Sequence, residues 1–123
     1  MQNLDEARDA IRRFVAERDW AQFHSPKNLA MALSVEASEL LEHFQWLTEA
    51  ESDALPPDVL DEVADEIADV QVYLLQLADR LGVDPLVAVE RKMEKNAAKY
   101  PVAVARGSAR KWNRPPDSMP DLE

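Results

Sequence analysis

The chain has 123 residues, of which 46% are hydrophobic, two are glycines and none is a cysteine. This length fits one domain, the shortage of glycine disfavours hairpin turns and phosphate-cradling loops, and the lack of cysteine excludes disulfides and thiolate metal sites. The formal net charge of −10 argues against a general affinity for nucleic acid and for anionic membranes. We therefore expect a helical protein that holds any metal ion through oxygen or histidine ligands.

The first predicted helix covers about residues 4–18, where apolar side chains recur at helical intervals. The residues before it lack the basic and apolar regions of a signal peptide, and no apolar run in the sequence approaches the roughly 18 residues of a membrane span. We therefore expect a cytoplasmic location and no membrane partner. After a linker at 20–27, Ser25-Pro26 is a typical helix start, and the second helix is expected to end near Trp46.

The second half of the chain contains two more predicted helices. Residues 49–58 are expected to form a loop, because Pro56-Pro57 disfavours helix. The next helix has the strongest pattern, an unbroken seam of apolar residues at steps of three and four: Leu60, Val63, Ile67, Val70, Leu74, Leu77 and Leu81. Gly82 is suited to end it, and Asp84-Pro85 to begin a fourth helix that ends near Tyr100.

These elements predict an all-α fold, a four-helix bundle with an irregular C-terminal tail. We assign residues 1–112 to the helical domain and residues 113–123, which contain three prolines, to a tail that we expect to be flexible.

Two acidic pairs stand beside the apolar seams of consecutive helices. Glu36 and Glu39 are three residues apart, as are Glu66 and Asp69, so the carboxylates of each pair point in roughly the same direction. One such pair is usually a solvated surface feature. If the two helices pack antiparallel, however, four carboxylates come together, and their mutual repulsion then requires a cation. Mg²⁺ prefers oxygen ligands and shares its shell with phosphates, so it could polarise a phosphoryl oxygen and activate water there.

A basic stripe on the fourth helix is a candidate phosphate site. It consists of Lys92, Lys95, Asn96 and Lys99, although an ordinary solvated face has the same pattern. A second basic group follows, and we interpret it as a phosphate clamp: Arg106, Arg110 and Lys111. Four aromatic residues are candidates for stacking on a base, although core packing is the commoner role: Trp20, Phe23, Trp46 and Tyr73. For His24 and His43 we favour a structural or surface role over metal ligation.

The ordered set of motifs from Ile11 to Lys111 resembles the MazG-like all-α nucleoside triphosphate pyrophosphohydrolases, and within them the dCTP pyrophosphatase branch. The most telling stretches are Glu17-Arg18-Asp19-Trp20, Phe23-His24, Pro26-Lys27-Asn28-Leu29, Glu36-x-x-Glu39, Phe44-Gln45-Trp46, Glu66-x-x-Asp69 with Tyr73, Lys92-Met93 with Asn96, Lys99-Tyr100-Pro101 and Arg106-Gly107-Ser108. The resemblance implies hydrolysis of a nucleotide, most of all dCTP or a modified dCTP, to the monophosphate and pyrophosphate.

The same resemblance implies roles for individual residues. Mg²⁺, for which Mn²⁺ can substitute, is expected on the catalytic carboxylates Glu36, Glu39, Glu66 and Asp69. The base is expected on Trp20, Trp46 and Tyr73. The phosphates are expected near Lys92, Asn96, Lys99, Arg106 and Lys111, the last two contributed by a neighbouring subunit. The resemblance also implies a homo-oligomer, usually a tetramer built as a dimer of dimers.

Some assignments stay open. The general base is taken as Glu39, with Glu42 and Asp65 as alternatives. His43 stands where the family usually has an aliphatic residue, so it receives no function.

Other functions compete with this interpretation. A related enzyme could prefer dUTP, a broad range of nucleotides or phosphoribosyl-ATP. A non-catalytic acidic helical module that binds proteins is a further alternative. A di-iron bundle ranks last, because neither histidine follows a glutamate by three residues.

Overall fold

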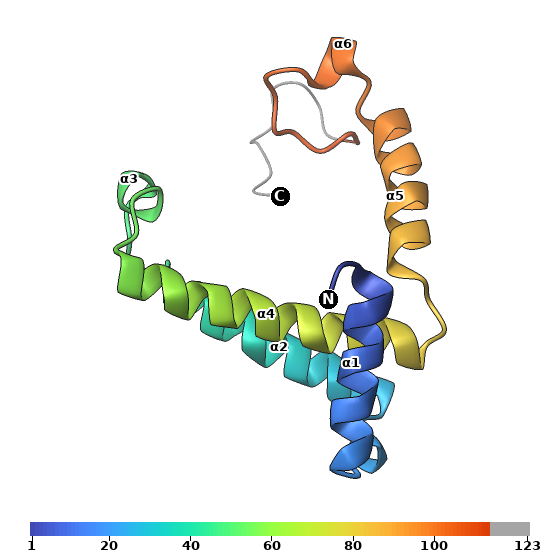
Figure 1. The fold of residues 1–123 in the computed structure, drawn as a ribbon. Coiled ribbons are helices and arrows are strands. Elements are labelled where there is room, and N and C mark those ends of the chain that lie inside the picture. Colours follow the sequence, from blue (N-terminus) through green and yellow to red (C-terminus); the bar gives the residue numbers. More distant parts are fainter. Residues whose placement is uncertain (114–123) are drawn as a thin grey trace. The chain divides into compact units, whose positions relative to one another are not determined.

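The protein, described here over residues 1–113 of a computed structural model, is helical, with no strand in that range. Its elements in chain order are α1 (Leu4–Glu17), the 3-10 turn η1 (Ala21–Phe23), α2 (Pro26–Glu42), α3 (Glu49–Ser52), α4 (Pro57–Arg80), α5 (Pro85–Lys99) and α6 (Val102–Ala105) (Figure 1). The predicted all-α fold with four long helices is confirmed. The chain divides into two compact units, Met1–Val83 and Asp84–Glu123. None of the helices within residues 1–113 is long and apolar enough to cross a membrane.

The first unit is an antiparallel hairpin of α2 and α4 to which α1 is attached. The two long helices lie side by side along their lengths, and α3 occupies the turn between them (Figure 1). Helix α1 packs on α4, where Arg12 and Asp79 form a two-pronged ion pair whose Nε–Oδ2 distance is 2.7 Å. The hairpin therefore places residues early in α2 beside residues late in α4.

The long helices begin where the sequence places their caps. The Ser25 hydroxyl accepts a hydrogen bond from the Asn28 amide at 3.2 Å, and Pro26 follows as the first helical residue. A carboxylate oxygen of Asp84 accepts hydrogen bonds from the amides of Leu86 and Val87 at 2.9 and 3.2 Å. Gly82 has a φ of 68°, which a residue without a Cβ adopts at little cost. Satisfied amide groups and a permissive glycine thus fix these boundaries locally.

Two boundaries differ from the sequence-based expectation. Helix α2 ends at Glu42, not near Trp46, and residues 43–47 form tight turns. The segment expected to be a loop contains the short helix α3, which a capping box stabilises: the Thr48 hydroxyl accepts from the Glu51 amide, and the Glu51 carboxylate accepts from the Thr48 amide. Because Thr48 caps this new helix, the chain leaves α2 early and reverses its direction before Thr48.

The second unit contains α5, α6 and the residues that follow them. Helix α6 is a single turn after Pro101, beyond the last of the four predicted helices. Residue 113, the first of the predicted flexible tail, is described, whereas residues 114–123 lie outside the described part of the chain.

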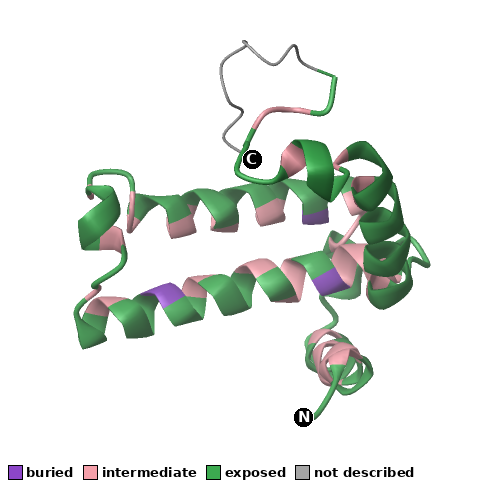
Figure 2. Cartoon of the chain, turned by 90° about the horizontal axis from the view of Figure 1, so that it is seen from above, coloured by how far each residue is buried: buried purple, intermediate pink, exposed green. Residues whose placement is uncertain are grey.

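The core of the described chain is small. Three hydrophobic side chains are buried, namely Leu29, Val63 and Leu75. Figure 2 shows that buried and half-buried residues line the facing sides of the two hairpin helices. The apolar seam of α4 separates into two rows. One row, Val63, Val70 and Leu77, is buried or half-buried, whereas the other row is exposed: Leu60, Ile67, Leu74 and Leu81.

Candidate metal site and nucleotide-binding residues

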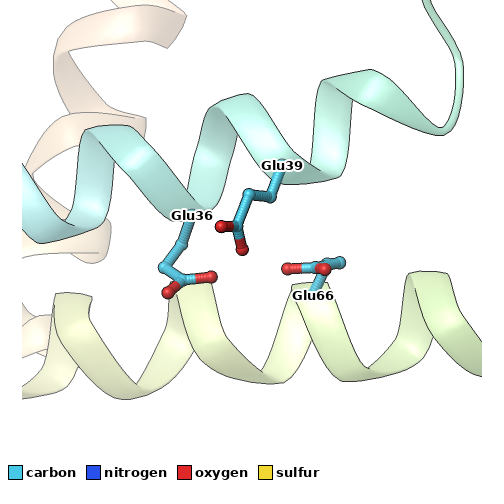
Figure 3. Close-up of side chains that lie close together, drawn as sticks. All are labelled: Glu36, Glu39 and Glu66. Atoms are coloured by element: carbon cyan, nitrogen blue, oxygen red, sulfur yellow. The ribbon is translucent and has the colours of Figure 1, made fainter.

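Three carboxylates converge between α2 and α4. Glu36 and Glu39 extend from α2 towards Glu66 of α4, and one oxygen from each of the three lies within 4.8 Å of the other two (Figure 3). The spacing of three residues puts Glu36 and Glu39 on one face of α2, and the antiparallel hairpin brings Glu66 opposite them. This cluster of three acidic residues could hold a metal ion.

Asp69, the fourth carboxylate selected from the sequence, lies outside this group of three. It is exposed on α4, one turn after Glu66. Its negative charge nevertheless acts on the cluster, since it contributes to raising the pKa values of Glu36 and Glu66.

The cluster is electrostatically unfavourable without a cation. Burial, followed by a hydrogen bond with Glu39 and by the charges of Glu39, Asp69 and Glu66, raises the pKa of Glu36 to about 7. Burial and the neighbouring Glu39 and Asp69 carboxylates also raise the pKa of Glu66. A shift in this direction means that the folded chain resists placing several negative charges here.

Two oxygens of the cluster have no partner in the described chain. The Oε2 atoms of Glu36 and Glu66 are buried and make no hydrogen bond within residues 1–113. A buried carboxylate oxygen without a donor is costly, and either a proton or a metal ion removes that cost. A hard divalent cation prefers oxygen ligands, and its positive charge offsets the repulsion that raises the pKa values of these carboxyl groups. These residues therefore fit such an ion.

His43, to which the sequence assigned no function, lies beside the cluster. Its Nε2 atom is 3.9 Å from Oε1 of Glu66, and its Nδ1 atom is 3.9 Å from Oε2 of Glu62. The proximity of His43 counteracts part of the increase in the pKa of Glu66. Sequence position alone could not reveal this contact, because it depends on how α2 and α4 are aligned.

The aromatic residues selected for base binding are separated within the first unit. Trp46 is 87% exposed in the turn after α2, Trp20 is partly exposed after α1, and Tyr73 is half-buried on α4. No ring contact joins these three residues in the described chain. The chain therefore presents three aromatic surfaces without assembling them into one base platform.

Trp20 is held in place by the way α1 ends. The Trp20 amide donates to the Val15 carbonyl and the Asp19 amide donates to the Ala16 carbonyl, each at 3.1 Å, while Asp19 has a φ of 51°. This is the Schellman arrangement, with a non-glycine residue in the left-handed position. The apolar contact that accompanies such ends is present as an edge-to-face packing of the Phe14 and Trp20 rings, 5.6 Å between centroids.

The second unit contains a separate cavity that gathers most of the predicted phosphate-binding residues. It has a volume of about 540 Å³, and its lining includes Lys92, Asn96 and Lys99 of α5 together with Lys111 from the C-terminal segment. Arg106 does not line it. Trp112, which the sequence analysis overlooked, does line it, with the Lys99 ammonium 5.4 Å from the centre of its ring. An aromatic residue next to a basic group was the available signal.

Comparisons with known proteins identify the family of this chain and several relatives. Residues 31–114 match the MazG-like family. Mouse dCTP pyrophosphatase 1 is 45% identical over 111 residues, which are 89% of this chain and 65% of the mouse protein. The human protein of the same name is 43% identical over 115 residues, or 92% of this chain and 68% of its own length. The chain thus spans about two thirds of the length of these relatives.

A solved structure has the same fold. The crystal structure of a pyrophosphatase from Archaeoglobus fulgidus superposes with a TM-score of 0.72 and 45% sequence identity. The alignment covers 82% of this chain and 94% of that protein. Because the family match covers more than half of the sequence, including both acidic pairs, this chain belongs to the MazG-like family.

Proposed function

We propose that the protein is a nucleoside triphosphate pyrophosphohydrolase that converts dCTP, or a modified dCTP, to the monophosphate and pyrophosphate. The observation that carries this proposal is the group of three facing carboxylates, two of whose buried oxygens have no partner in the described chain. The names of the curated relatives, dCTP pyrophosphatase 1, support the substrate.

The metal in this proposal is Mg²⁺, with Mn²⁺ as a substitute, held by Glu36, Glu39, Glu66 and Asp69. When bound, Mg²⁺ polarises a phosphoryl oxygen and increases the acidity of a coordinated water. The carboxylates position the ion, and Glu39 is assigned to accept a proton from the attacking water, with Glu42 and Asp65 as alternatives. Attack at the α-phosphorus then releases pyrophosphate, a reaction that depends mainly on positioning and charge neutralisation.

The remaining predicted residues bind the substrate. Lys92, Asn96, Lys99 and Lys111, which line one cavity, are assigned to the phosphates together with Arg106. Trp20, Trp46 and Tyr73 are assigned to the base.

The proposed assembly is a homo-oligomer, a tetramer built as a dimer of dimers. It is supported by the exposed apolar row of α4, because a second copy of the hairpin would cover that row. We further propose a cytoplasmic protein without nucleic acid or membrane partners, consistent with its acidic composition.

Product analysis tests the proposed reaction. We expect dCTP and Mg²⁺ to yield dCMP and pyrophosphate, resolved by ion-exchange chromatography, with solvent ¹⁸O entering dCMP. Release of dCDP and phosphate, or no turnover of any common nucleotide, would refute the proposal. A panel with dUTP and the four ribonucleotides determines whether the substrate range is broader.

A matched pair of variants tests the ligand assignment. Glu39→Gln keeps the side-chain shape but removes the negative charge, so we expect at least a 100-fold loss of kcat with an unchanged far-UV spectrum; the magnitude is about that of removing one key electrostatic group. Glu90→Gln, an exposed position of α5, is the control and should leave kcat unchanged.

A further inference from the structure

An imidazole ring lies beside the carboxylates of the candidate metal site. His43 is the C-terminal cap residue of α2, and each of its ring nitrogens lies near a different carboxylate: Nε2 is 3.9 Å from Oε1 of Glu66, and Nδ1 is 3.9 Å from Oε2 of Glu62. We propose that His43 is a positioning residue that holds the Glu66 carboxylate from outside the metal site, and that Glu62 orients the imidazole ring. This inference rests on the metal site of the proposed function and assigns two residues that had no role in it.

Helical spacing explains why one ring reaches two carboxylates. Glu62 and Glu66 are four residues apart on α4, so they are neighbours on one face of that helix. His43 follows Glu39 by four residues and keeps helical backbone angles, φ −69° and ψ −18°, which places it on the carboxylate-bearing face of α2. Because the hairpin is antiparallel, the end of α2 meets the first half of α4, and the ring spans one turn of α4.

The two oxygens of Glu66 have different surroundings. Oε1 has the imidazole beside it, whereas Oε2 is buried and makes no hydrogen bond within residues 1–113. A carboxylate that binds a metal ion is itself held by outer groups, which fix its orientation. His43 suits that role because an imidazole carries at least one N–H group in either protonation state. It can therefore hold Oε1 and leave Oε2 for a cation.

The contact between His43 and Glu66 is shielded from solvent. Both side chains are 21% exposed, whereas the side chain of Glu62 is 69% exposed. The separation of 3.9 Å is longer than a hydrogen bond, but polar contacts of an active site are often long without ligand and shorten in the complex. We therefore expect a strong effect of His43 on the metal site and a weaker effect of Glu62.

His43 itself lies outside the ligand group. Within the described residues, the acidic or histidine side chains whose ligand atoms lie within 4.8 Å of one another are Glu36, Glu39 and Glu66. The two nitrogens of His43 lie near separate carboxylates, so neither is free to share an ion with that group. An outer position, next to a ligand and not among the ligands, fits this geometry.

Metal binding to the variants tests the role of His43. Leucine removes the N–H groups and suits the apolar cavity around α3, to whose lining His43 contributes. In calorimetric titrations of Mn²⁺ alone into the full chain, we expect His43→Leu to raise Kd about 10-fold or more, as the loss of an outer-shell partner does. A Kd within about twofold of the wild type would overturn the proposal.

A conservative variant separates positioning from packing. His43→Gln keeps an N–H group at similar reach, so its Kd for Mn²⁺ should stay within about threefold of the wild type. It also maintains the test if His43→Leu does not fold, which far-UV circular dichroism shows. A glutamine variant that has lost as much affinity as expected for His43→Leu would overturn the proposed contact.

Glu62 is tested against a neighbour of equal charge. We expect Glu62→Gln to raise the Kd for Mn²⁺ about 2- to 5-fold, since the ring then loses its outer partner. Asp61→Asn removes the same charge from an adjacent exposed position of α4 and should leave the Kd unchanged. Equal effects of the two variants would remove Glu62 from the proposal.

The identity of the metal separates an outer role from direct ligation. Imidazole favours Ni²⁺ over Mn²⁺ as a ligand, whereas an outer group acts on the carboxylate alone. We therefore expect His43→Leu to weaken the binding of Ni²⁺ and of Mn²⁺ by the same factor. A much larger loss for Ni²⁺ would make His43 a ligand and overturn its outer position.

Turnover completes the test and separates it from that of the reaction. With excess Mg²⁺ and dCTP, kcat of His43→Leu should stay within about threefold of the wild type, while the Mg²⁺ concentration for half-maximal activity rises about 10-fold. Hydrolysis of dCTP with metal affinities that His43→Leu leaves unchanged would refute this inference alone. Weaker metal binding by His43→Leu in a protein that hydrolyses no nucleotide would support the inference and refute the hydrolase.

Discussion

Glu36 shows how one side chain can indicate a candidate metal site. It sits on the apolar side of α2, faces two other glutamates and has a buried oxygen with no partner in the described chain. The sequence could identify the unfavourable position of this carboxylate, since Leu33 and Leu40 flank Glu36 on the apolar stripe. What it could not supply is the alignment of α2 and α4, which decides that Glu66 joins the group while Asp69 stands outside it.

Glu36→Gln should make the metal-free protein more stable than the wild type at high pH. The folded chain raises the pKa of Glu36 to about 7 from an ordinary value of 4.5. The stabilising contribution of its protonated form is therefore complete below pH 4.5 and lost as the pH rises through about 7. Glutamine does not titrate. In urea unfolding with EDTA, the free energy of unfolding of the variant should therefore rise relative to that of the wild type between pH 5 and pH 8.

Adding Mg²⁺ should make the wild type more stable than Glu36→Gln at pH 8, the reverse of the order in EDTA. The wild type gains stability from an ion that binds the folded state, and Glu36→Gln, which lacks one ligand charge, gains less. Glu90→Gln serves as the control in both series. An advantage of Glu36→Gln that is equal at pH 5 and pH 8 would mean that Glu36 is not the titrating group.

At the scale of single elements, local chemistry determined how well the sequence could be interpreted. Ser25, Gly82 and Asp84 fix their helix boundaries with their own side chains or conformational freedom, and these boundaries were predicted correctly. The pattern of Thr48 followed by Glu51 is an equally local signal for α3, and it was overlooked. The end of α2 was missed because residues 43–47 contain neither glycine nor proline.

The end of α1 can be tested at Asp19, which holds a left-handed conformation with a φ of 51°. We expect Asp19→Val to lower the free energy of unfolding by about 1–2 kcal/mol, since a branched side chain is strained in this region. Asp19→Gly should stay within about 0.5 kcal/mol, because glycine adopts the conformation freely. Urea unfolding measures both. Equal losses in the two variants would show that the Asp19 side chain, and not its backbone, is what matters.

The attachment of α1 to α4 depends on pH through Asp79. The hydrogen bond and charge of Arg12 lower the pKa of Asp79 from 3.8, so its stabilisation is present above that value and lost as the pH falls through the folded pKa. We expect Asp79→Asn to reduce the free energy of unfolding by about 0.5–1 kcal/mol at pH 7, the range for a well-formed but partly exposed pair. The difference in the free energy of unfolding between Asp79→Asn and the wild type should shrink towards pH 3.

Asp9 provides the matched control for this pair. It also lies beside Arg12, at 3.6 Å, but its side chain is 57% exposed. Asp9→Asn should therefore change stability by less than about 0.3 kcal/mol at either pH. If Asp9→Asn and Asp79→Asn changed the free energy of unfolding equally, the two-pronged geometry at Asp79 would add no stability.

At the scale of the whole molecule, a pattern of apolar residues does not reveal which surface covers those residues. The seam of α4 was interpreted as one bundle surface, whereas the structure divides it into a buried or half-buried row and an exposed row. Both rows consist of aliphatic residues seven positions apart, so sequence periodicity cannot distinguish packing within the chain from packing between copies. Residues of the second unit line a cavity of their own, and the apolar pattern does not reveal this cavity either.

Leu74, in the exposed row of α4, tests whether a second copy covers this surface. It is 44% exposed in the single chain, and we expect Leu74→Lys to place an unpaired charge at the interface of the proposed oligomer. Light scattering after gel filtration should show an oligomer for the wild type and a species of smaller mass for the variant. Ala68→Lys adds the same charge on an exposed position about 120° around the helix and should leave the mass unchanged. A wild type that is monomeric, or a Leu74→Lys oligomer of full mass, would show that another partner covers this row.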